Sequence, residues 1–211
     1  MVLPNRDSEA IIDKPKLLLV EGKDEVEFFN ALLKKINKQD EVLVIPVGGK
    51  DNFKYSFPAT VKRSGFREKV RSIAIVRDGD NDYMAAFESV KNIVKDNGYV
   101  PPRDPDSFNT SGIIKVGIFI MPGDLQNGML EHLCLRTQAE NPIMQCVDSF
   151  IQSVAAIEDI TQPKNLVKAK AQAFLSVMPE IVNTVGLGAQ KGYWNLEHDC
   201  LFKLNQFLDE L

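Results

Sequence analysis

The sequence predicts an α/β fold in which a mainly parallel four-stranded sheet carries helices on both faces and is followed by a helical C-terminal part. Three observations support this prediction. Apolar runs of strand length recur through residues 14–125, amphipathic segments of helix length separate them, and glycines or acidic residues end several of the runs. Strands that alternate with helices in this way are typical of parallel sheets covered on both faces.

Four strands are expected, because four apolar runs are short and end at residues that stop a strand. They cover residues 16–20, 42–47, 72–76 and 114–121. The first is continuously apolar up to Glu21, as in a strand buried on both faces. The second is accepted despite Pro46, and the fourth ends at Pro122 and Gly123, which favour a turn.

Helical segments are expected between these strands. They lie around residues 23–36, over 50–69 with an interruption near Pro58, and over 83–96. Their apolar residues recur every three or four positions, which places them on one face of a helix. Residues 99–110 are rich in Pro, Asp and Asn and are expected to form a surface loop. Together these elements predict a Rossmann-like core.

The rest of the chain is expected to be helical. Pro142 and Pro163 stand where prolines of a first helical turn belong, and apolar residues spaced from Leu196 to Leu211 predict a last helix. The predicted organisation is an N-terminal extension, an α/β core and a helical part packed on that core. These regions cover residues 1–13, 14–125 and 126–211.

Composition excludes several classes of protein. The 211 residues are 44% hydrophobic and 26% charged with a formal net charge of −4, as in a folded globular protein. An acidic chain does not coat nucleic acid by bulk attraction, so any such contact must use local basic patches. The sequence shows no membrane-length apolar run and no export signal, so we expect a cytoplasmic protein. Its three cysteines, Cys134, Cys146 and Cys200, lack metal-ligand spacing and are expected to be buried thiols.

Acidic residues come directly after two of the predicted strands. Glu21 follows the first, and Asp78, Asp80 and Asp82 follow the third at alternate positions. In an open parallel sheet, ligands collect at the carboxyl ends of the strands. Clustered carboxylates repel unless a cation or proton neutralises them, and oxygen ligands suit Mg2+ or Mn2+. We therefore predict a metal site at this edge, although each acid taken alone is equally explained as a cap of the next helix.

Two other motifs share part of this spacing. Asp78-x-Asp80-x-Asp82 imitates the start of a calcium-binding EF-hand loop, but Tyr83 stands where that loop needs Gly and Ser89 where it needs Glu. The EF-hand interpretation is therefore rejected. A phosphatase that forms an aspartyl-phosphate also uses Asp-x-Asp after a strand. That alternative stays open, but such enzymes usually use the first core strand.

The two acidic strand ends resemble the signature motifs of Toprim domains. In LLLVEGKDEVEFF, Glu21 matches the family's Glu; in SIAIVRDGDND, Asp78 and Asp80 match its Asp-x-Asp, and Asp82 would be the extra acid of the topoisomerase version. Toprim domains occur in primases, topoisomerases, recombination-repair proteins, overcoming-lysogenization-defect nucleases and ribosomal-RNA maturases. The resemblance covers roughly residues 14–125. It implies a compact Toprim-type sheet of four parallel strands, Mg2+ held by the Asp pair, and a Glu that acts as general acid or base in phosphodiester chemistry.

Further strings resemble a stand-alone Toprim-like family of uncharacterised prokaryotic proteins over nearly the whole chain. They are VGGKDNF, FIMPGD, GMLEHLCL and KGYWNLEHD. The sequence departs from the larger Toprim enzymes in three ways. It has no zinc-binding arrangement of the primase type, no P-loop ATPase segment of the repair-nuclease type, and no room for a topoisomerase tyrosine domain. The resemblance therefore leaves phosphodiester hydrolysis, or binding without turnover.

Two more acids are candidates for the same site. Glu131 and Asp124 both follow the fourth predicted strand, and either side chain could add a carboxylate to the metal. The ordinary alternative for each is an exposed acid on the protein surface. The sequence does not separate the two, and Glu131 is included in the predicted ligand set.

Basic residues supply candidates for phosphate or nucleic-acid binding. Lys23 and Lys50 follow glycines at strand ends, where a cation and free backbone N–H groups could meet phosphate. Arg63 and Arg67 belong to the densest basic segment, residues 62–71, which could follow a nucleic-acid backbone. A solvated surface remains the commoner role for such residues.

The sequence thus predicts a Mg2+- or Mn2+-dependent phosphodiester-processing enzyme, a nuclease acting on DNA or RNA. Glu21, Asp78 and Asp80 would be catalytic, and the same residues with Asp82 and Glu131 would hold the metal. The alternative is a non-catalytic module that binds metal and nucleic acid or nucleotide within a defence or repair complex. Net acidity favours the module, whereas the three signature acids favour the enzyme. A homo-oligomer or a partner protein is compatible with either.

Overall fold

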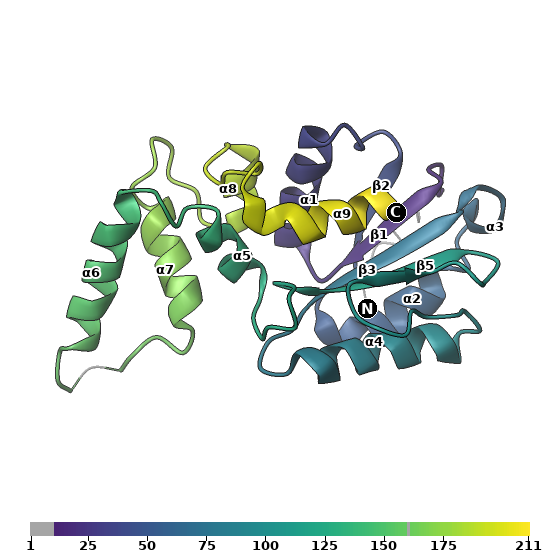
Figure 1. Cartoon of the computed structure of the whole chain (residues 1–211), viewed down its shortest axis with the longest axis horizontal. Helices are drawn as coiled ribbons and strands as arrows, with labels where there is room; N and C mark the ends of the chain where they lie inside the picture. The colour runs from purple at the N-terminus through teal and green to yellow at the C-terminus, as the bar shows by residue number, and fades with distance from the viewer. Residues whose placement is uncertain (1–10, 160) are drawn as a thin grey trace, which may run out of the picture.

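A five-stranded sheet forms the centre of the fold (Figure 1). The structure is a computed structural model that describes residues 11–159 and 161–211. The strands are β1 (Lys16–Val20), β2 (Val42–Pro46), β3 (Ser72–Asp78), β4 (Ser107–Asn109) and β5 (Lys115–Met121). They are ordered β2-β1-β3-β5-β4, and only the pairing of β4 with β5 is antiparallel. The expected mainly parallel sheet is confirmed, but with five strands.

The additional strand corrects the prediction of a four-stranded sheet. β4 lies within residues 99–110, which the sequence predicts to be a loop. A strand of three residues is too short to show an alternating pattern, and its pairing depends on contacts made by the folded chain. Phe108 pairs with Gly117 across the ladder, and a Cβ at Gly117 would come within 2.3 Å of the Phe108 ring. The missing side chain of Gly117 therefore lets the phenyl ring lie flat on the sheet.

Helices occupy both faces of the sheet and the region beyond its carboxyl edge. They are α1 (Lys23–Lys35), α2 (Phe53–Thr60), α3 (Phe66–Lys69), α4 (Tyr83–Asp96), α5 (Leu130–Arg136), α6 (Ile143–Ala155), α7 (Leu166–Leu175), α8 (Val185–Gln190) and α9 (Phe202–Glu210), with 3-10 turns η1 (Lys50–Asn52) and η2 (Asp199–Leu201). The bounds predicted for α4 are confirmed. Asp82 caps this helix, because its carboxylate accepts a hydrogen bond from the Ala85 N–H at 2.9 Å.

Three expectations about prolines and helix ends are wrong. Pro58 lies inside α2, and the interruption falls instead before α3, at Gly65, whose φ of 85° belongs to the left-handed region that glycine tolerates. Pro142 is the N-cap of α6, but Pro163 precedes Asn165, the N-cap of α7, and so lies outside its first turn. The last helix, α9, begins at Phe202, whereas apolar spacing places its start near residue 196.

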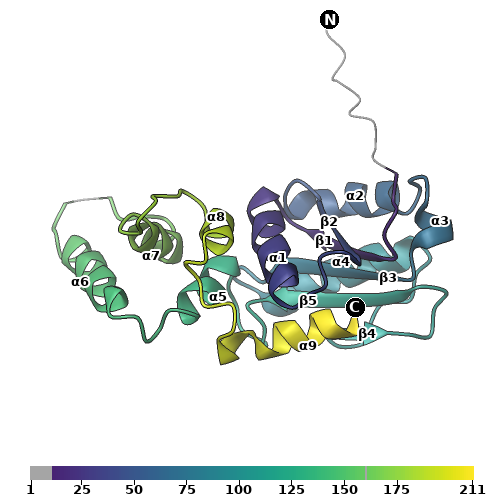
Figure 2. The same ribbon diagram turned by 90° about the horizontal axis from the view of Figure 1, so that it is seen from above.

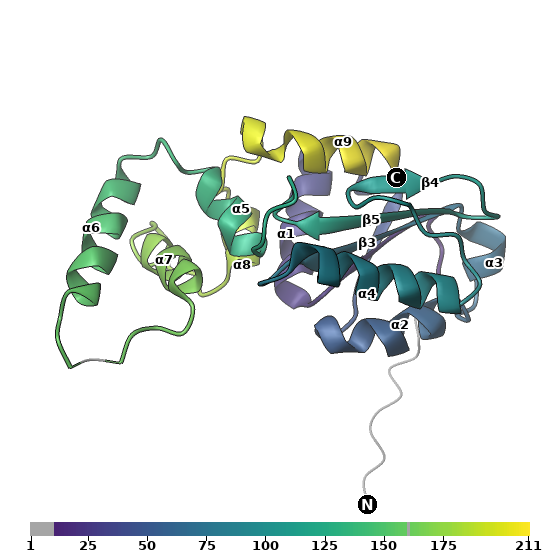
Figure 3. The same ribbon diagram turned by 60° about the horizontal axis from the view of Figure 1, so that its bottom comes forward.

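Successive strand residues point to opposite faces of the sheet, and each face has its own core. Leu18 and Val20 of β1 pack with α1, α5, α8 and α9, whereas Leu17 and Leu19 pack with α2 and α4. Figure 3 shows α9 on one side of β3 and β5 and α4 on the other. Strands with both faces covered must be apolar throughout, which explains the continuous apolar runs in the sequence.

The chain changes direction within the sheet between β1 and β3. These strands are neighbours, yet β1 continues into α1 on one face and β3 continues into α4 on the other. Where neighbouring strands send their connections to opposite faces, a crevice opens at their carboxyl ends. The fold therefore places the residues between β1 and α1 beside the end of β3.

The C-terminal helices divide into two groups. Helix α9 returns to the sheet, where the Ser72 hydroxyl donates a hydrogen bond to the Leu211 carbonyl at 2.7 Å. Helices α6 and α7 pair with each other and project from the opposite end of the molecule to α3 (Figures 1 and 2). The boundary near residue 126 stays a prediction.

Residues 1–10 of the predicted N-terminal extension lie outside the described residues. Ile12 is buried, and its N–H donates to the Ser64 carbonyl at 3.0 Å. Cys134 is buried as expected, but the expectation is wrong for Cys146, which is exposed. Within the described ranges, no helix has the length and apolar character needed to cross a membrane.

Replacing Phe207 by Ala is expected to lower the free energy of unfolding by about 3–5 kcal/mol. The Phe207 ring in α9 lies 4.5 Å from the Phe108 ring and 5.2 Å from the Phe119 ring, centroid to centroid, so truncation opens a cavity over the sheet. Urea unfolding measures the change. Phe202→Ala is the matched control, because Phe202 belongs to the same helix but is 67% exposed, and it should change stability by less than about 0.5 kcal/mol.

Candidate metal centre

Glu21 and Asp78 meet at the carboxyl ends of β1 and β3. The Asp78 N–H donates a hydrogen bond to Oε1 of Glu21 at 3.1 Å. Asp78 is the last residue of β3, because this strand runs two residues further than its apolar pattern predicts. Arg77 places Nε 3.9 Å from the same Glu21 oxygen, in a pair where both side chains are largely buried. The sequence-based expectation that acids after separate strands lie together thus agrees with the geometry for this pair.

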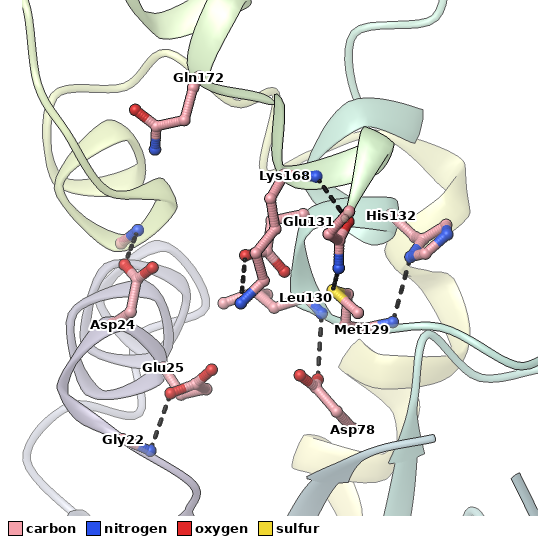
Figure 4. Close-up of polar contacts among 12 residues, drawn as sticks. Gly22, Asp24, Glu25, Asp78, Met129, Leu130, Glu131, His132, Lys168 and Gln172 are labelled. Atoms are coloured by element: carbon pink, nitrogen blue, oxygen red, sulfur yellow. Dashed lines mark hydrogen bonds and ion pairs between the residues drawn. The ribbon is translucent and has the colours of Figure 1, made fainter. Parts of the chain in front are cut away.

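Asp78 is a buried carboxylate with little to neutralise it. Its Oδ1 accepts a hydrogen bond from the Leu130 N–H at 3.1 Å, at the start of α5 (Figure 4). Burial raises the pKa of Asp78 well above its ordinary value, and the charges of Glu21, Glu25 and Glu131 raise it further, with a smaller contribution from Asp80. Like charges in a site of low polarity oppose the ionisation of one another. We call Glu21, Glu25, Asp78, Asp80 and Glu131 the carboxylate cluster.

Asp80 lies at the outer edge of the cluster in a constrained backbone conformation. Its φ is 46°, in the left-handed region, and its N–H donates to the Gly128 carbonyl at 2.7 Å. Its Oδ2 accepts a hydrogen bond from Nζ of Lys50 at 2.7 Å. Lys50 belongs to η1, after β2, so the pair links the ends of two strands separated by β1.

Glu131 approaches the cluster from the first turn of α5 and is 9% exposed. Nζ of Lys168, in α7, lies 3.4 Å from its Oε1 (Figure 4). The start of α7 is fixed by Asn165, whose side chain accepts from the Lys168 N–H at 3.0 Å. Lys168 was not identified from the sequence, which gives no sign that a lysine 37 positions beyond Glu131 would be its partner.

Glu25 also belongs to the cluster and was not predicted from the sequence. Its Oε2 accepts from the Gly22 N–H at 2.8 Å, which caps α1. Burial raises the pKa of Glu25, and nearby charges, including that of Glu131, contribute. Figure 4 shows Glu25, Asp78 and Glu131 around a common space, from α1, β3 and α5. The available signal was the spacing of Glu21 and Glu25, which places Glu25 one helical turn beyond the strand end.

The cluster has the chemistry of a divalent-cation site. It offers only carboxylate oxygens, which suit Mg2+ or Mn2+, and its most buried member is raised in pKa by its acidic neighbours. As the side chains stand, no group of three or more His, Cys, Asp or Glu in residues 11–159 and 161–211 is arranged to hold a metal ion. The donor atoms are of the kind that a divalent cation prefers, and at the edge of the cluster Asp80 and Glu131 are each paired with a lysine.

Two predicted acids are not brought into the cluster. Asp82 is exposed and its carboxylate caps α4. Asp124 is exposed and forms an ion pair with Lys203 of α9. Of the two acids that the sequence leaves open after the fourth predicted strand, the fold brings Glu131 and not Asp124 beside Asp78. The metal-ligand role predicted for Asp82 is untested, and the cluster is defined without this residue.

The predicted basic residues lie at both ends of the sheet. Lys23 begins α1 at the carboxyl end of β1, and Lys50 reaches the cluster directly. Arg63 and Arg67 lie in the segment that leads into the start of β3, at the other end of this strand. A strand of seven residues spans about 20 Å, so these arginines do not share the site. Their role in binding a nucleic-acid backbone stays a prediction.

The fold and the cluster define an α/β protein with a buried, all-oxygen site at the switch point of its sheet. The chain belongs to the family described as "Protein of unknown function (DUF3226)", whose model matches residues 15–211. No curated protein matches the chain.

The chain is similar to two solved structures of the C-terminal region of the Xanthomonas campestris pv. campestris OLD protein. The one phased with iodine has a TM-score of 0.49 and 16% sequence identity, over 95% of this chain and 96% of that chain. The one phased with platinum has a TM-score of 0.41 and 17% identity, over 94% and 98%.

Replacing Asp78 by Asn is expected to stabilise the metal-free protein by about 1–2 kcal/mol near neutral pH. Asn keeps the oxygen that accepts from the Leu130 N–H but removes a buried charge that its neighbours repel. Because the pKa of Asp78 is raised in the folded state, the wild-type protein regains this stability as the pH falls and the carboxyl group takes up its proton. The difference between the two proteins should therefore shrink from pH 8 towards pH 5.

Urea unfolding in the presence of EDTA measures this difference at each pH. Asp82→Asn is the matched control, because Asn caps a helix as well as Asp and Asp82 lies outside the cluster. Its stability should stay within about 0.5 kcal/mol of the wild type at every pH. An Asp78→Asn protein less stable than wild type at pH 8 would contradict the proposed repulsion.

Proposed function

We propose that the protein is a Mg2+- or Mn2+-dependent phosphodiester-processing enzyme, a nuclease, and that the carboxylate cluster is its active site. The observation that carries the proposal is the burial of Asp78 among four other carboxylates at the carboxyl ends of β1 and β3. Packing like charges together costs free energy of folding, and titratable groups perturbed in this way concentrate at functional sites. A divalent cation is the partner that would offset the cost.

The residues of the cluster would have different roles in the reaction. Asp78 and Asp80 would hold the cation, and Glu25 of α1 and Glu131 of α5 would be further ligands. A bound divalent cation supplies positive charge at a phosphoryl oxygen and lowers the pKa of bound water. Glu21 is suited to proton transfer, because burial raises its pKa above the ordinary value and the Asp78 N–H orients its carboxylate.

Cationic side chains at the rim favour a phosphate-bearing substrate. Lys50 and Lys168 have side chains that are 50% and 58% exposed and are paired with different members of the cluster, Asp80 and Glu131. Both side chains can rotate from the carboxylates to a phosphate, because the ammonium group is carried on a flexible four-carbon stem. These local positive charges would attract a phosphate backbone even though the net charge of the chain is −4.

Metal binding is the first test of this proposal. Titration of the wild-type protein with Mn2+ or Mg2+ should raise its unfolding temperature, because a ligand that binds only the folded state stabilises it. At a hundred times the dissociation constant, the gain is about 2.7 kcal/mol. Asp78→Asn and Asp80→Asn should lose most of this gain, whereas Asp82→Asn should retain it. The absence of any shift at millimolar metal would count against the site.

Cleavage is the second test. End-labelled single- and double-stranded RNA and DNA are incubated with the protein and Mn2+, and the products are separated by length. Glu21→Gln should reduce the cleavage rate by about 10²–10⁴-fold, because it removes the proposed proton carrier. If wild type binds metal and oligonucleotides but cleaves none, the alternative of a non-catalytic binding module is supported. If Glu21→Gln and Asp78→Asn cleave as fast as wild type, the cluster is not the active site.

A further inference from the structure

The backbone just before Lys50 is hydrogen-bonded to Glu21 at the end of β1. It follows Gly48 and Gly49, whose φ angles of 84° and 110° make the tight reversal after β2. The N–H groups of both glycines donate to the Glu21 carbonyl, at 2.9 and 2.7 Å. The root of the Lys50 side chain is therefore fixed relative to the carboxylate cluster.

The Lys50 side chain forms an ion pair with Asp80, whose carboxylate would bind the cation in the proposed function. Its Nζ lies 2.7 Å from Oδ2 of Asp80, and the two side chains are 50% and 33% exposed. Asp80 itself cannot easily move away, because its backbone is in the left-handed region and its N–H is bonded to Gly128. Across the described part of the chain, the Asp80 carboxylate has no second hydrogen-bond donor.

We propose that Lys50 is an exchangeable counter-ion of the cluster: it pairs with Asp80 in the metal-free protein and transfers to a substrate phosphate when a divalent cation binds Asp80. This inference rests on the proposed metal site. The exchange makes metal and nucleic acid strengthen the binding of each other. The metal ion frees Lys50 for a phosphate, and the phosphate draws Lys50 away from Asp80, which the metal ion binds. Such coupling must be reciprocal in binding free energy.

The strength of the ion pair suits an exchange of this kind. A half-exposed lysine–carboxylate pair changes an equilibrium constant by at most about five-fold, since water screens it. Lys50 would therefore lower the affinity for metal slightly and would not block the site. Arg77 cannot play the same part, because its side chain is 13% exposed and lies against Glu21. Lys168 is paired with Glu131, at 3.4 Å, and not with Asp80.

The first experiment measures metal affinity without nucleic acid. Isothermal titration with Mn2+ should show that Lys50→Met binds the ion about two- to five-fold more tightly than wild type, because a competing cation has been removed. Lys50→Arg, which keeps the charge, should not bind more tightly. Lys54→Met is the matched control: Lys54 lies one helical turn further, over the Tyr55 ring, and has no ion pair with the cluster. Its affinity should equal that of wild type.

The second experiment measures binding of a short single-stranded DNA labelled with a fluorophore. Anisotropy is recorded with EDTA and with Ca2+, and intact DNA is confirmed afterwards by gel. For wild type, Ca2+ should strengthen binding; for Lys50→Met, this gain should be reduced by about five-fold. In the presence of Ca2+, the dependence of log affinity on log salt concentration should be weaker for Lys50→Met than for wild type. Its slope should be smaller in magnitude by about 1, as expected when one phosphate contact is lost. With EDTA the two proteins should bind alike.

The outcomes separate this inference from the function on which it rests. If Lys50→Met binds Mn2+ with wild-type affinity while Asp78→Asn no longer binds it, the exchange is overturned and the metal site stands. If wild type fails to bind Mn2+, both proposals are overturned. Tighter binding of Mn2+ by Lys50→Met, with loss of the Ca2+-dependent gain in DNA affinity, supports the exchange.

Discussion

The mutual repulsion of buried carboxylates at the ends of β1 and β3 is the constraint on which the rest of the site depends. Asp78 is held in place by the Leu130 N–H, and it in turn donates its own N–H to Glu21. The acids at the edge of the cluster are met by lysines from two other elements, Lys50 and Lys168. The negative charge of the cluster is thus met by backbone N–H groups and by two partly exposed lysine side chains.

The core of the site could be predicted from the sequence because its signals are local. Glu21 and Asp78 stand at the ends of apolar runs, and strands that are buried on both faces must be apolar up to the point where they emerge. Once two such strands belong to one parallel sheet, their ends lie at the same edge. The limits of α4 were predictable for the same reason, since apolar periodicity and the capping residue Asp82 agree.

The remainder depends on contacts between distant segments. β4 exists because Phe108 lies on Gly117 and under Phe207, and no window of sequence contains all three. Lys168 reaches Glu131 only after α7 has packed beside α5. A regular spacing was also misleading: Asp82 continues the alternate acids after β3, but the start of α4 turns its side chain to the helix N–H groups. Sequence pattern therefore located the edge of the sheet but not which side chains gather there.

The position of Leu130 has a consequence for dividing the molecule into parts. The residue lies beyond the predicted boundary of the α/β core, yet its N–H holds the most buried acid of that core. A fragment ending near residue 126 would keep the strand-end acids while losing this donor, and Glu131 and Lys168 with it. The site is therefore shared between the two halves of the chain rather than carried by a transplantable module, and the helical half would have to accompany the sheet in any exchange or fusion.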